Sequence, residues 1–212
     1  MSFGEIDPDY NCDRCPRLNA FIREQRANHS EWFNGPVPSF GDRNAHVLVV
    51  GLAPGLQGAN RTGRPFTGDY AGDLLYQTIE TFGFSEGRYD KHPDDGLTLK
   101  GMAITNAVRC VPPQNKPTGA EIKNCRPFLQ ATIASYSNLK GFLVLGRIAH
   151  ETLLRTFGLP LKAYPFAHGA VHELENGYTI FDSYHCSRYN TNTGRLTTEM
   201  FEDVFRKIAA TL

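Results

Sequence analysis

The chain has 212 residues, 41% of them hydrophobic, and its 22 basic and 22 acidic side chains give a formal net charge of zero. This length predicts a single domain, residues 1–212, that can bury a substantial core. The balanced charge excludes wholesale coating of nucleic acid, although it leaves room for a local basic face. No apolar run approaches the roughly 20 residues of a membrane span, and residues 1–12 lack a signal-peptide pattern, so we expect a cytoplasmic protein without a membrane partner.

The first motif along the chain is Cys12-Asp-Arg-Cys15, a C-x-x-C step followed by Pro16. Two thiolates at this spacing can reach one metal ion, whereas a thioredoxin-like motif would need a preceding strand pattern that is absent here. A second pair, Cys110 and Cys125, flanks a Pro-rich turn, so a cluster could join the N-terminal segment to the core. Free thiols are the alternative, and spacing does not separate zinc from an iron–sulfur cluster, because both accept four thiolates.

A long glycine-rich stretch begins after the apolar run Val47–Val50, which predicts a strand buried on both faces. Glycines recur at 51, 55, 58, 63, 68 and 72, so we expect neither helix nor strand before Leu74. Open α/β sheets bind ligands where such loops leave the carboxyl ends of strands, and a structureless loop of this length is uncommon unless it is functional or disordered. The stretch is therefore a candidate active-site loop, with a plain surface connection as the alternative.

The remaining pattern alternates helices with strands. Helices are expected over residues 17–31, 74–82, 118–133, 147–158 and 201–212, and further strands over residues 101–108, 141–146 and 178–183. Thr118 and Glu121 form a capping-box pattern, and Pro127 is expected to bend its helix or reset its start. The predicted fold class is α/β, a three-layer sandwich with a central four-stranded parallel sheet flanked by helices.

Polar and aromatic side chains near the predicted strand ends are candidates for a site. Asn106 can offer a donor and an acceptor side by side to an imide or pyrimidine edge, or it can cap a turn as a satisfied buried residue. Phe66 is either core filler or a plate for a flat ring. Asp69 and Asp73 are candidates to activate water or stabilise a cation, although Asp73 also suits the N-cap of the next helix.

Among the seven histidines, only His185 stands at a strand end that leads into a polar loop. It can donate a hydrogen bond or proton to a leaving group near neutral pH. His92 and His150 are expected on the surface or on helices instead. Cys186, which follows His185, is predicted to be an ordinary thiol.

Several stretches together resemble a known family. These are the four spaced cysteines and, in this order along the chain, GLAPGLQGANRTGRPFTGDYAGDLLY, TNAVRC and HCSRYNTNTGRLT, which together span nearly the whole chain. They resemble the uracil-DNA glycosylase superfamily, specifically its iron–sulfur family five. Ala53 stands in Gly51-Leu-Ala-Pro54 where many members carry an acid or amide, and family five shares this apolar position.

The resemblance implies a role for each motif. Cys12, Cys15, Cys110 and Cys125 would hold a four-iron four-sulfur (4Fe-4S) cluster. His185 and Asn106 would stabilise the departing base, and Asp69, in a Thr67-Gly-Asp69 step that resembles a family signature, would act on the sugar or on water. The implied substrate-binding residues are Gly51, Ala53, Pro54, Gly55, Phe66, Ser187 and Arg188.

The implied reaction is hydrolysis of the N-glycosidic bond of uracil in double- or single-stranded DNA, which leaves an abasic site and initiates base excision repair. The resemblance extends to hypoxanthine and xanthine, and we expect a monomer. A base must be flipped out of the stack to react, so Arg188, Tyr189 and Asn190 are candidates to enter the gap. Candidate phosphate contacts, each with a surface role as the alternative, are Arg61, Arg64, Lys116 and Arg195.

Two other functions are alternatives to this enzyme. One is a non-catalytic iron–sulfur module that binds DNA or transfers electrons. The other is a nucleotide hydrolase or phosphate-binding protein, which the sequence disfavours because it has no G-x-x-x-x-G-K-[ST] element and no lysine in the loop.

Overall fold

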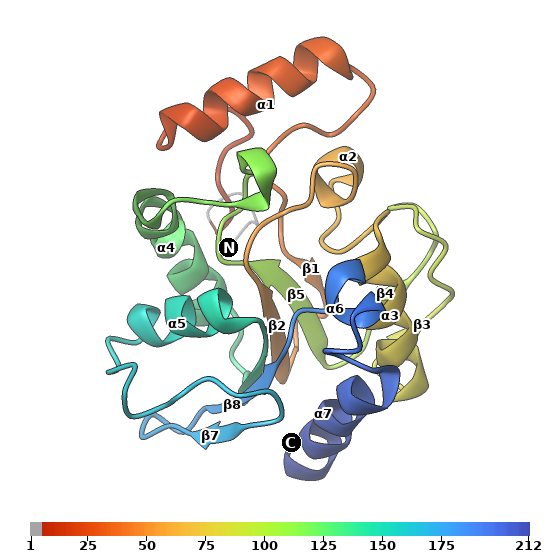
Figure 1. Ribbon diagram of the computed structural model, residues 1–212, viewed down its shortest axis with the longest axis vertical. Coiled ribbons are helices and arrows are strands. Elements are labelled where there is room, and N and C mark those ends of the chain that lie inside the picture. Colours follow the sequence, from red (N-terminus) through yellow and green to blue (C-terminus); the bar gives the residue numbers. More distant parts are fainter. Residues whose placement is uncertain (1–5) are drawn as a thin grey trace.

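The computed structural model describes residues 6–212, so the first five residues of the predicted domain lie outside the described part of the chain. Its central sheet has six strands in the order β1-β5-β2-β6-β8-β7 (Figure 1). These strands are β1 (Phe40–Gly41), β2 (Val47–Gly51), β5 (Met102–Asn106), β6 (Gly141–Leu145), β7 (Val171–Glu173) and β8 (Thr179–Ser183). A separate antiparallel pair joins β3 (Ser85–Glu86) to β4 (Thr98–Leu99).

The four predicted parallel strands are confirmed, but the sheet is wider than predicted. β5, β2, β6 and β8 are mutually parallel, whereas β1 and β7 add antiparallel edges. These edge strands have only two and three residues, which is too short for an alternating pattern to show in the sequence.

Helices cover both faces of this sheet. The described helices are α1 (Pro16–Asn28), α2 (Ala59–Thr62), α3 (Tyr70–Thr81), α4 (Gly119–Ser135), α5 (Arg147–Thr156), α6 (Arg188–Asn192) and α7 (Thr198–Thr211), with a 3-10 turn at Pro113–Asn115. In Figure 1, α4 and α5 lie on one side of the sheet and α3 and α7 on the other. The predicted three-layer α/β sandwich is therefore confirmed.

The core consists of one apolar layer on each face of the sheet. Val47 and Val49 of β2 point into the layer with α3 and α7, whereas Leu48 and Val50 point into the layer with α4 and α5. Every residue of β2 is buried. Because both faces are covered, the strands read as continuous apolar runs rather than alternating ones.

The observed helices differ from the predicted ones in several places, most clearly around the glycine-rich stretch. α3 begins at Tyr70 with Asp69 as its N-cap, so Asp73 is not the cap and instead pairs with Lys91 at 2.9 Å. The short helix α2 also interrupts the glycine-rich stretch that was predicted to lack helix. Pro127 lies inside α4, whose residues run as one helix from the capping box that Thr118 and Glu121 form as predicted.

The N-terminal segment is fastened to the rest of the domain by specific contacts. Arg17 of α1 donates two hydrogen bonds to Glu121 of α4, at 2.8 and 2.7 Å. Leu18 packs with Val108, Ile122 and Cys125 in a small apolar cluster. No helix among the described residues is long and apolar enough to cross a membrane.

Candidate active site

A cleft of about 680 Å³ opens at the carboxyl ends of the parallel strands. Three strand ends deliver residues to it: β2 ends at Gly51, β5 at Asn106, and β8 leads into His185. Its lining residues are Leu52, Ala53, Pro54, Gly55, Gln57, Ala59, Phe66, Gly68, Asp69, Tyr70, Ala71, Asn106, Asn115, His185, Ser187 and Arg188. The structure thus brings residues from four distant parts of the sequence to one edge of the sheet, where open α/β sheets bind ligands.

Asn106 presents an unused acceptor at this cleft. Its side chain is 2% exposed, and its Oδ1 atom has no hydrogen-bond partner. Gly51 lies beside it, because a Cβ atom at Gly51 would come within 2.4 Å of Asn106 Oδ1 and 2.7 Å of Phe66 Cζ. A buried polar atom without a partner costs about 1–3 kcal/mol, so Asn106 Oδ1 is suited to a ligand that donates a hydrogen bond.

Phe66 is held in a conformation that non-glycine residues rarely adopt, with φ at 53°. Tyr89 donates a hydrogen bond to its carbonyl oxygen at 3.3 Å, and the α3 helix approaches so closely that a Cβ at Gly72 would meet that oxygen at 1.8 Å. The Phe66 ring lies 5.9 Å from the His185 ring between centroids, with 29° between their planes. A strained backbone at a cleft commonly marks a functional site.

His185 is half-buried above this ring. Desolvation lowers its pKa from 6.5 to about 4, so the imidazole is neutral at pH 7. Asn190 donates a hydrogen bond to the His185 carbonyl oxygen at 2.8 Å, which ties the α6 helix to this strand end. A neutral imidazole carries one ring N–H and can donate it to an oxygen that becomes negative.

Asp69 also lines the cleft, in space that Gly55 and Gly58 leave open. Its carboxylate caps α3 by accepting a hydrogen bond from Gly72 N at 3.2 Å. A Cβ atom would lie 2.3 Å from Asp69 Oδ2 if placed on Gly58, and 3.0 Å if placed on Gly55. Desolvation by burial raises the pKa of this carboxyl group, against the hydrogen bonds from Gly72 and Ala71.

The rim of the cleft is formed by α6. Ser187 caps this helix, accepting a hydrogen bond from Asn190 N at 3.4 Å. The Arg188 guanidinium lies 5.3 Å from the centre of the Tyr70 ring, and Tyr189 is 72% exposed. Tyr70 and Asn115 also line the cleft, although the sequence predicted no role for either. Tyr70 is one of many residues in the glycine-rich stretch, and no motif marks Asn115.

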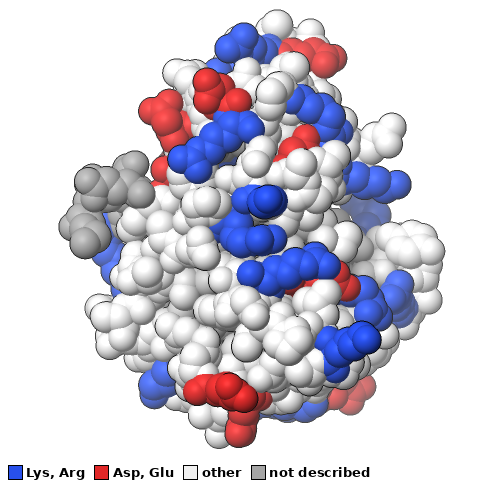
Figure 2. All heavy atoms as spheres, turned by 90° about the vertical axis from the view of Figure 1, so that its left-hand side faces the viewer, with Lys and Arg blue, Asp and Glu red and all other residues white. Residues whose placement is uncertain are grey.

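The structure shows which of the candidate phosphate contacts are exposed and where His150 lies. Arg64 is 4% exposed and paired with Asp95 at 2.7 Å, so its predicted phosphate contact is wrong. Arg61, Lys116 and Arg195 are exposed. His150 lies on helix α5, as one expectation had it, but it is buried rather than on the surface. Figure 2 shows basic side chains gathered across the middle of the face that lies to the left in Figure 1.

The four paired cysteines converge on a second, smaller cavity. Cys12, Cys15, Cys110 and Cys125 all line it, together with apolar residues that include Leu18, Val108 and Phe128. All four are free thiols. Two N–H groups point at their sulfurs: Arg109 N donates to Cys125 Sγ at 3.3 Å and Asn124 Nδ2 to Cys15 Sγ at 3.8 Å. Four convergent sulfurs with an apolar surround and N–H donors form a donor set that fits an iron–sulfur cluster.

Buried amides connect the end of α1 with the helix α2 beside the cleft. Asn60 of α2 donates to Asn34 Oδ1 at 2.9 Å, and Asn34 donates to the carbonyl oxygen of His29 at the end of α1 at 2.6 Å. The helix α2 directly follows Gly58, whose missing side chain leaves room for Asp69. The α1 helix therefore supports the loop that faces the Asp69 carboxylate.

The sequence places this chain in one family. Residues 38–209 match the Uracil DNA glycosylase superfamily, and the chain belongs to it. The crystal structure of wild-type Pedobacter heparinus SMUG2 shares the fold, with a TM-score of 0.50 and 14% identity over 90% of this chain and 83% of that one.

Within the superfamily, strong matches carry the name Type-5 uracil-DNA glycosylase. The protein of that name from Thermus thermophilus is 46% identical over 199 residues, covering 91% of this chain and 90% of the relative. Its counterpart from Pyrobaculum aerophilum is 40% identical, covering 94% and 88%. A Type-4 uracil-DNA glycosylase from Pyrobaculum aerophilum is 31% identical, covering 70% and 62%.

Proposed function

We propose that this protein is a DNA glycosylase that hydrolyses the N-glycosidic bond of uracil in DNA and leaves an abasic site. The observation that carries the proposal is the unpartnered Oδ1 of Asn106, beside the ring of Phe66 and within a cleft that neutral His185 also lines. Uracil is a flat ring whose imide N–H lies between two carbonyl groups. Its edge is therefore complementary to an amide that offers one acceptor and one donor.

Recognition begins with extrusion of the base from the helix, because the bond is not accessible within the stack. The flipped base would lie on Phe66 with its edge against Asn106. The exposed Tyr189 and the neighbouring Arg188 are the side chains that α6 offers to the gap left in the duplex. The supporting feature is the position of α6 at the rim of the cleft.

Bond cleavage sends the electron pair of the C1′–N bond into the base and leaves a cationic sugar. A hydrogen bond from neutral His185 would stabilise the resulting oxyanion, and a donor that is already in place needs no reorganisation. The Asp69 carboxylate would stabilise the sugar cation or accept a proton from the attacking water. Water then adds to C1′, and the departing base takes up a proton. The raised pKa of Asp69 suits a proton acceptor more than an ordinary surface carboxylate would.

We further propose that Cys12, Cys15, Cys110 and Cys125 hold a 4Fe-4S cluster. Such a cluster, when bound, supplies a cross-link between the segment before α1 and the elements around β5 and α4. The cysteines and the two N–H groups directed at their sulfurs support this assignment. Brown colour, absorbance near roughly 400 nm and iron analysis of purified protein would separate iron–sulfur from zinc.

The test of the enzyme uses a labelled duplex with one uracil opposite guanine, followed by alkaline cleavage of the abasic strand. Asp69→Asn is the informative variant, because asparagine also caps helices and so preserves the start of α3. Asp73→Asn is the matched control four residues further along the same helix. We expect Asp69→Asn to lower the single-turnover rate about 10²–10³-fold and Asp73→Asn to change it little.

Each outcome of this assay decides a specific point. Excision that survives Asp69→Asn would overturn the role of Asp69 and keep the enzyme. No release of uracil by cluster-loaded protein that still binds the duplex would make the chain a non-catalytic binding module. Duplexes with hypoxanthine or xanthine and single-stranded uracil DNA, tested in parallel, measure the substrate range. The expectations of a monomer and of a cytoplasmic location stay predictions.

A further inference from the structure

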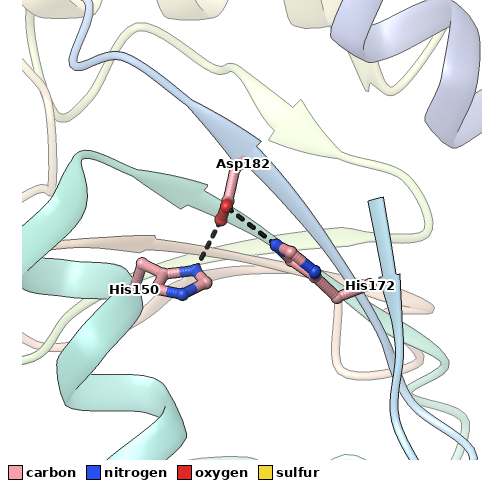
Figure 3. Close-up of side chains that lie close together, drawn as sticks. All are labelled: His150, His172 and Asp182. Carbon is pink, nitrogen blue, oxygen red and sulfur yellow. Dashed lines mark hydrogen bonds and ion pairs between the residues drawn. The ribbon is translucent and has the colours of Figure 1, made fainter. Parts of the chain in front are cut away.

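Two histidines converge on one buried carboxylate outside the cleft, as Figure 3 shows. Asp182 of β8 contacts His150 of α5 through Oδ1 and Nδ1 at 2.7 Å, and His172 of β7 through Oδ2 and Nε2 at 3.2 Å. The side chains of Asp182, His150 and His172 are 0%, 1% and 12% exposed. The cleft lining includes none of these residues, and the glycosylase chemistry does not use them.

The hydrogen bonds of His150 hold its ring in one orientation. His150 Nδ1 faces the Asp182 carboxylate, and His150 Nε2 faces the carbonyl oxygen of Tyr164 at 2.8 Å. A carbonyl oxygen only accepts, so Nε2 carries the proton that it donates to Tyr164. The Nδ1 atom is thereby directed at Asp182, together with Nε2 of His172.

The same three side chains form a ligand set for a divalent metal ion. Two imidazoles and one carboxylate are the protein ligands of many three-ligand zinc sites, in which water fills the fourth position. One ligand atom from each residue lies within 4.8 Å of the others. Zinc bonds of about 2.0–2.2 Å place neighbouring ligand atoms roughly 3.3–3.5 Å apart in a tetrahedron. The contacts of 2.7 and 3.2 Å run to different oxygens of Asp182, and the ligand atoms all lie within 4.8 Å of one another. A metal would therefore draw them together by about 1.5 Å at most, the difference between 4.8 and 3.3 Å.

The surroundings of the cluster also suit a metal. His150 uses its second nitrogen to donate to the Tyr164 carbonyl, which is how protein frameworks usually orient a metal-binding histidine. His172 lies on the edge strand β7 and is the most exposed of the three, so a metal ion would reach the cluster from its side. The three residues come from three different elements, so a metal would cross-link α5 to β7 and β8.

We propose that His150, His172 and Asp182 bind one divalent transition-metal ion, with Zn²⁺ as the best fit to this nitrogen and oxygen donor set. Nδ1 of His150 and Nε2 of His172, the two nitrogens that now face Asp182, would each offer a lone pair to the metal. A proton on either of these nitrogens would pass to solvent or, in His172, to the other ring nitrogen. Asp182 would supply a carboxylate oxygen.

The experiment is calorimetric titration of ZnCl₂ into protein whose iron–sulfur cluster is loaded, so that Cys12, Cys15, Cys110 and Cys125 are occupied. His172→Asn removes one ligand, and His92→Asn is the matched control, because His92 is 66% exposed and outside the cluster. Circular dichroism verifies that the variants are folded.

We expect wild type and His92→Asn to bind one zinc ion with a rise in Tm. We expect His172→Asn to lose at least about tenfold in affinity. Co²⁺ bound to wild type should show d–d bands without a thiolate charge-transfer band, which tests the donor set without any variant. The proposal is overturned if zinc binding is equal in wild type and His172→Asn, or if Co²⁺ shows thiolate ligation.

Discussion

Replacing Gly51 with alanine tests how closely the cleft is built around Asn106. Gly51 is the last residue of β2 and lies in register with Asn106 of β5. An added Cβ would stand 2.4 Å from Asn106 Oδ1 and 2.7 Å from Phe66 Cζ, whereas ordinary contacts begin near 3.4 Å. The amide must therefore move by about 1 Å, the difference between 3.4 and 2.4 Å, unless the Phe66 ring and the strand share the displacement.

A displacement of this size should affect catalysis more than folding. Misplacing a positioning group by about 1 Å can cost on the order of 10²-fold in rate, whereas overpacking a buried site typically costs about 1–3 kcal/mol in the free energy of unfolding. In a chain of this length such a cost lowers Tm by roughly 2–12 °C. The variant should thus remain folded at 25 °C.

The assay is single-turnover excision from a uracil–guanine duplex, with Tm measured on the same preparation. We expect Gly51→Ala to lose on the order of 10²-fold in rate. The control is Gly119→Ala at the start of α4, where an added Cβ meets nothing within 4 Å, and its rate should equal that of wild type. A wild-type rate in folded Gly51→Ala protein would refute the inference that Asn106 and Phe66 must hold their present positions.

Three further predictions concern pH, the amide contact between Asn34 and Asn60, and the cysteines. The pKa of His185 is about 4 in the folded protein and 6.5 in the reference state, so the unfolded chain binds more protons between these values. Stability should therefore fall as pH drops from 6.5 toward 4, with a smaller slope in His185→Asn, as urea unfolding at several pH values would show. Asn60→Ala leaves the buried Asn34 Oδ1 without its donor, which should cost about 1–3 kcal/mol in urea unfolding; an unchanged midpoint would contradict this. Cys125→Ser should lose bound iron and Cys186→Ser should retain it, and equal iron content in the two proteins would remove Cys125 from the ligand set.

The layers of the fold followed from local patterns. Four largely apolar runs predicted the parallel strands, because strands covered on both faces are rich in apolar residues and do not alternate with polar ones. The Thr118 and Glu121 capping box predicted the start of α4, since both of its hydrogen bonds lie within one helical turn. The edge strands β1 and β7 were missed, because two or three residues contain no period to detect.

The site was only partly determined by the sequence. Motifs marked Asn106, His185 and the glycine-rich stretch as exceptional, and the paired cysteines suggested a shared ligand. The sequence could not tell that Asp69 rather than Asp73 caps α3, because both acids precede apolar residues at helical spacing. It also could not separate the buried Arg64 from exposed arginines, since Asp95, its partner, lies 31 residues away.

Long-range contacts determined the features of the site that local sequence patterns did not reveal. The role of Gly51 as space for Asn106 and Phe66, and that of Gly58 as space for Asp69, depend on which strands and loops become neighbours in the folded chain. The convergence of His150, His172 and Asp182 also depends on tertiary contacts, because α5, β7 and β8 are neighbours only in the folded chain. Residue type and local spacing thus determined the main helices and strands and the family. Tertiary packing decided burial, ion pairing and the lowered pKa of His185. The physical reason is that packing sets the distance of each group from water and from its partners.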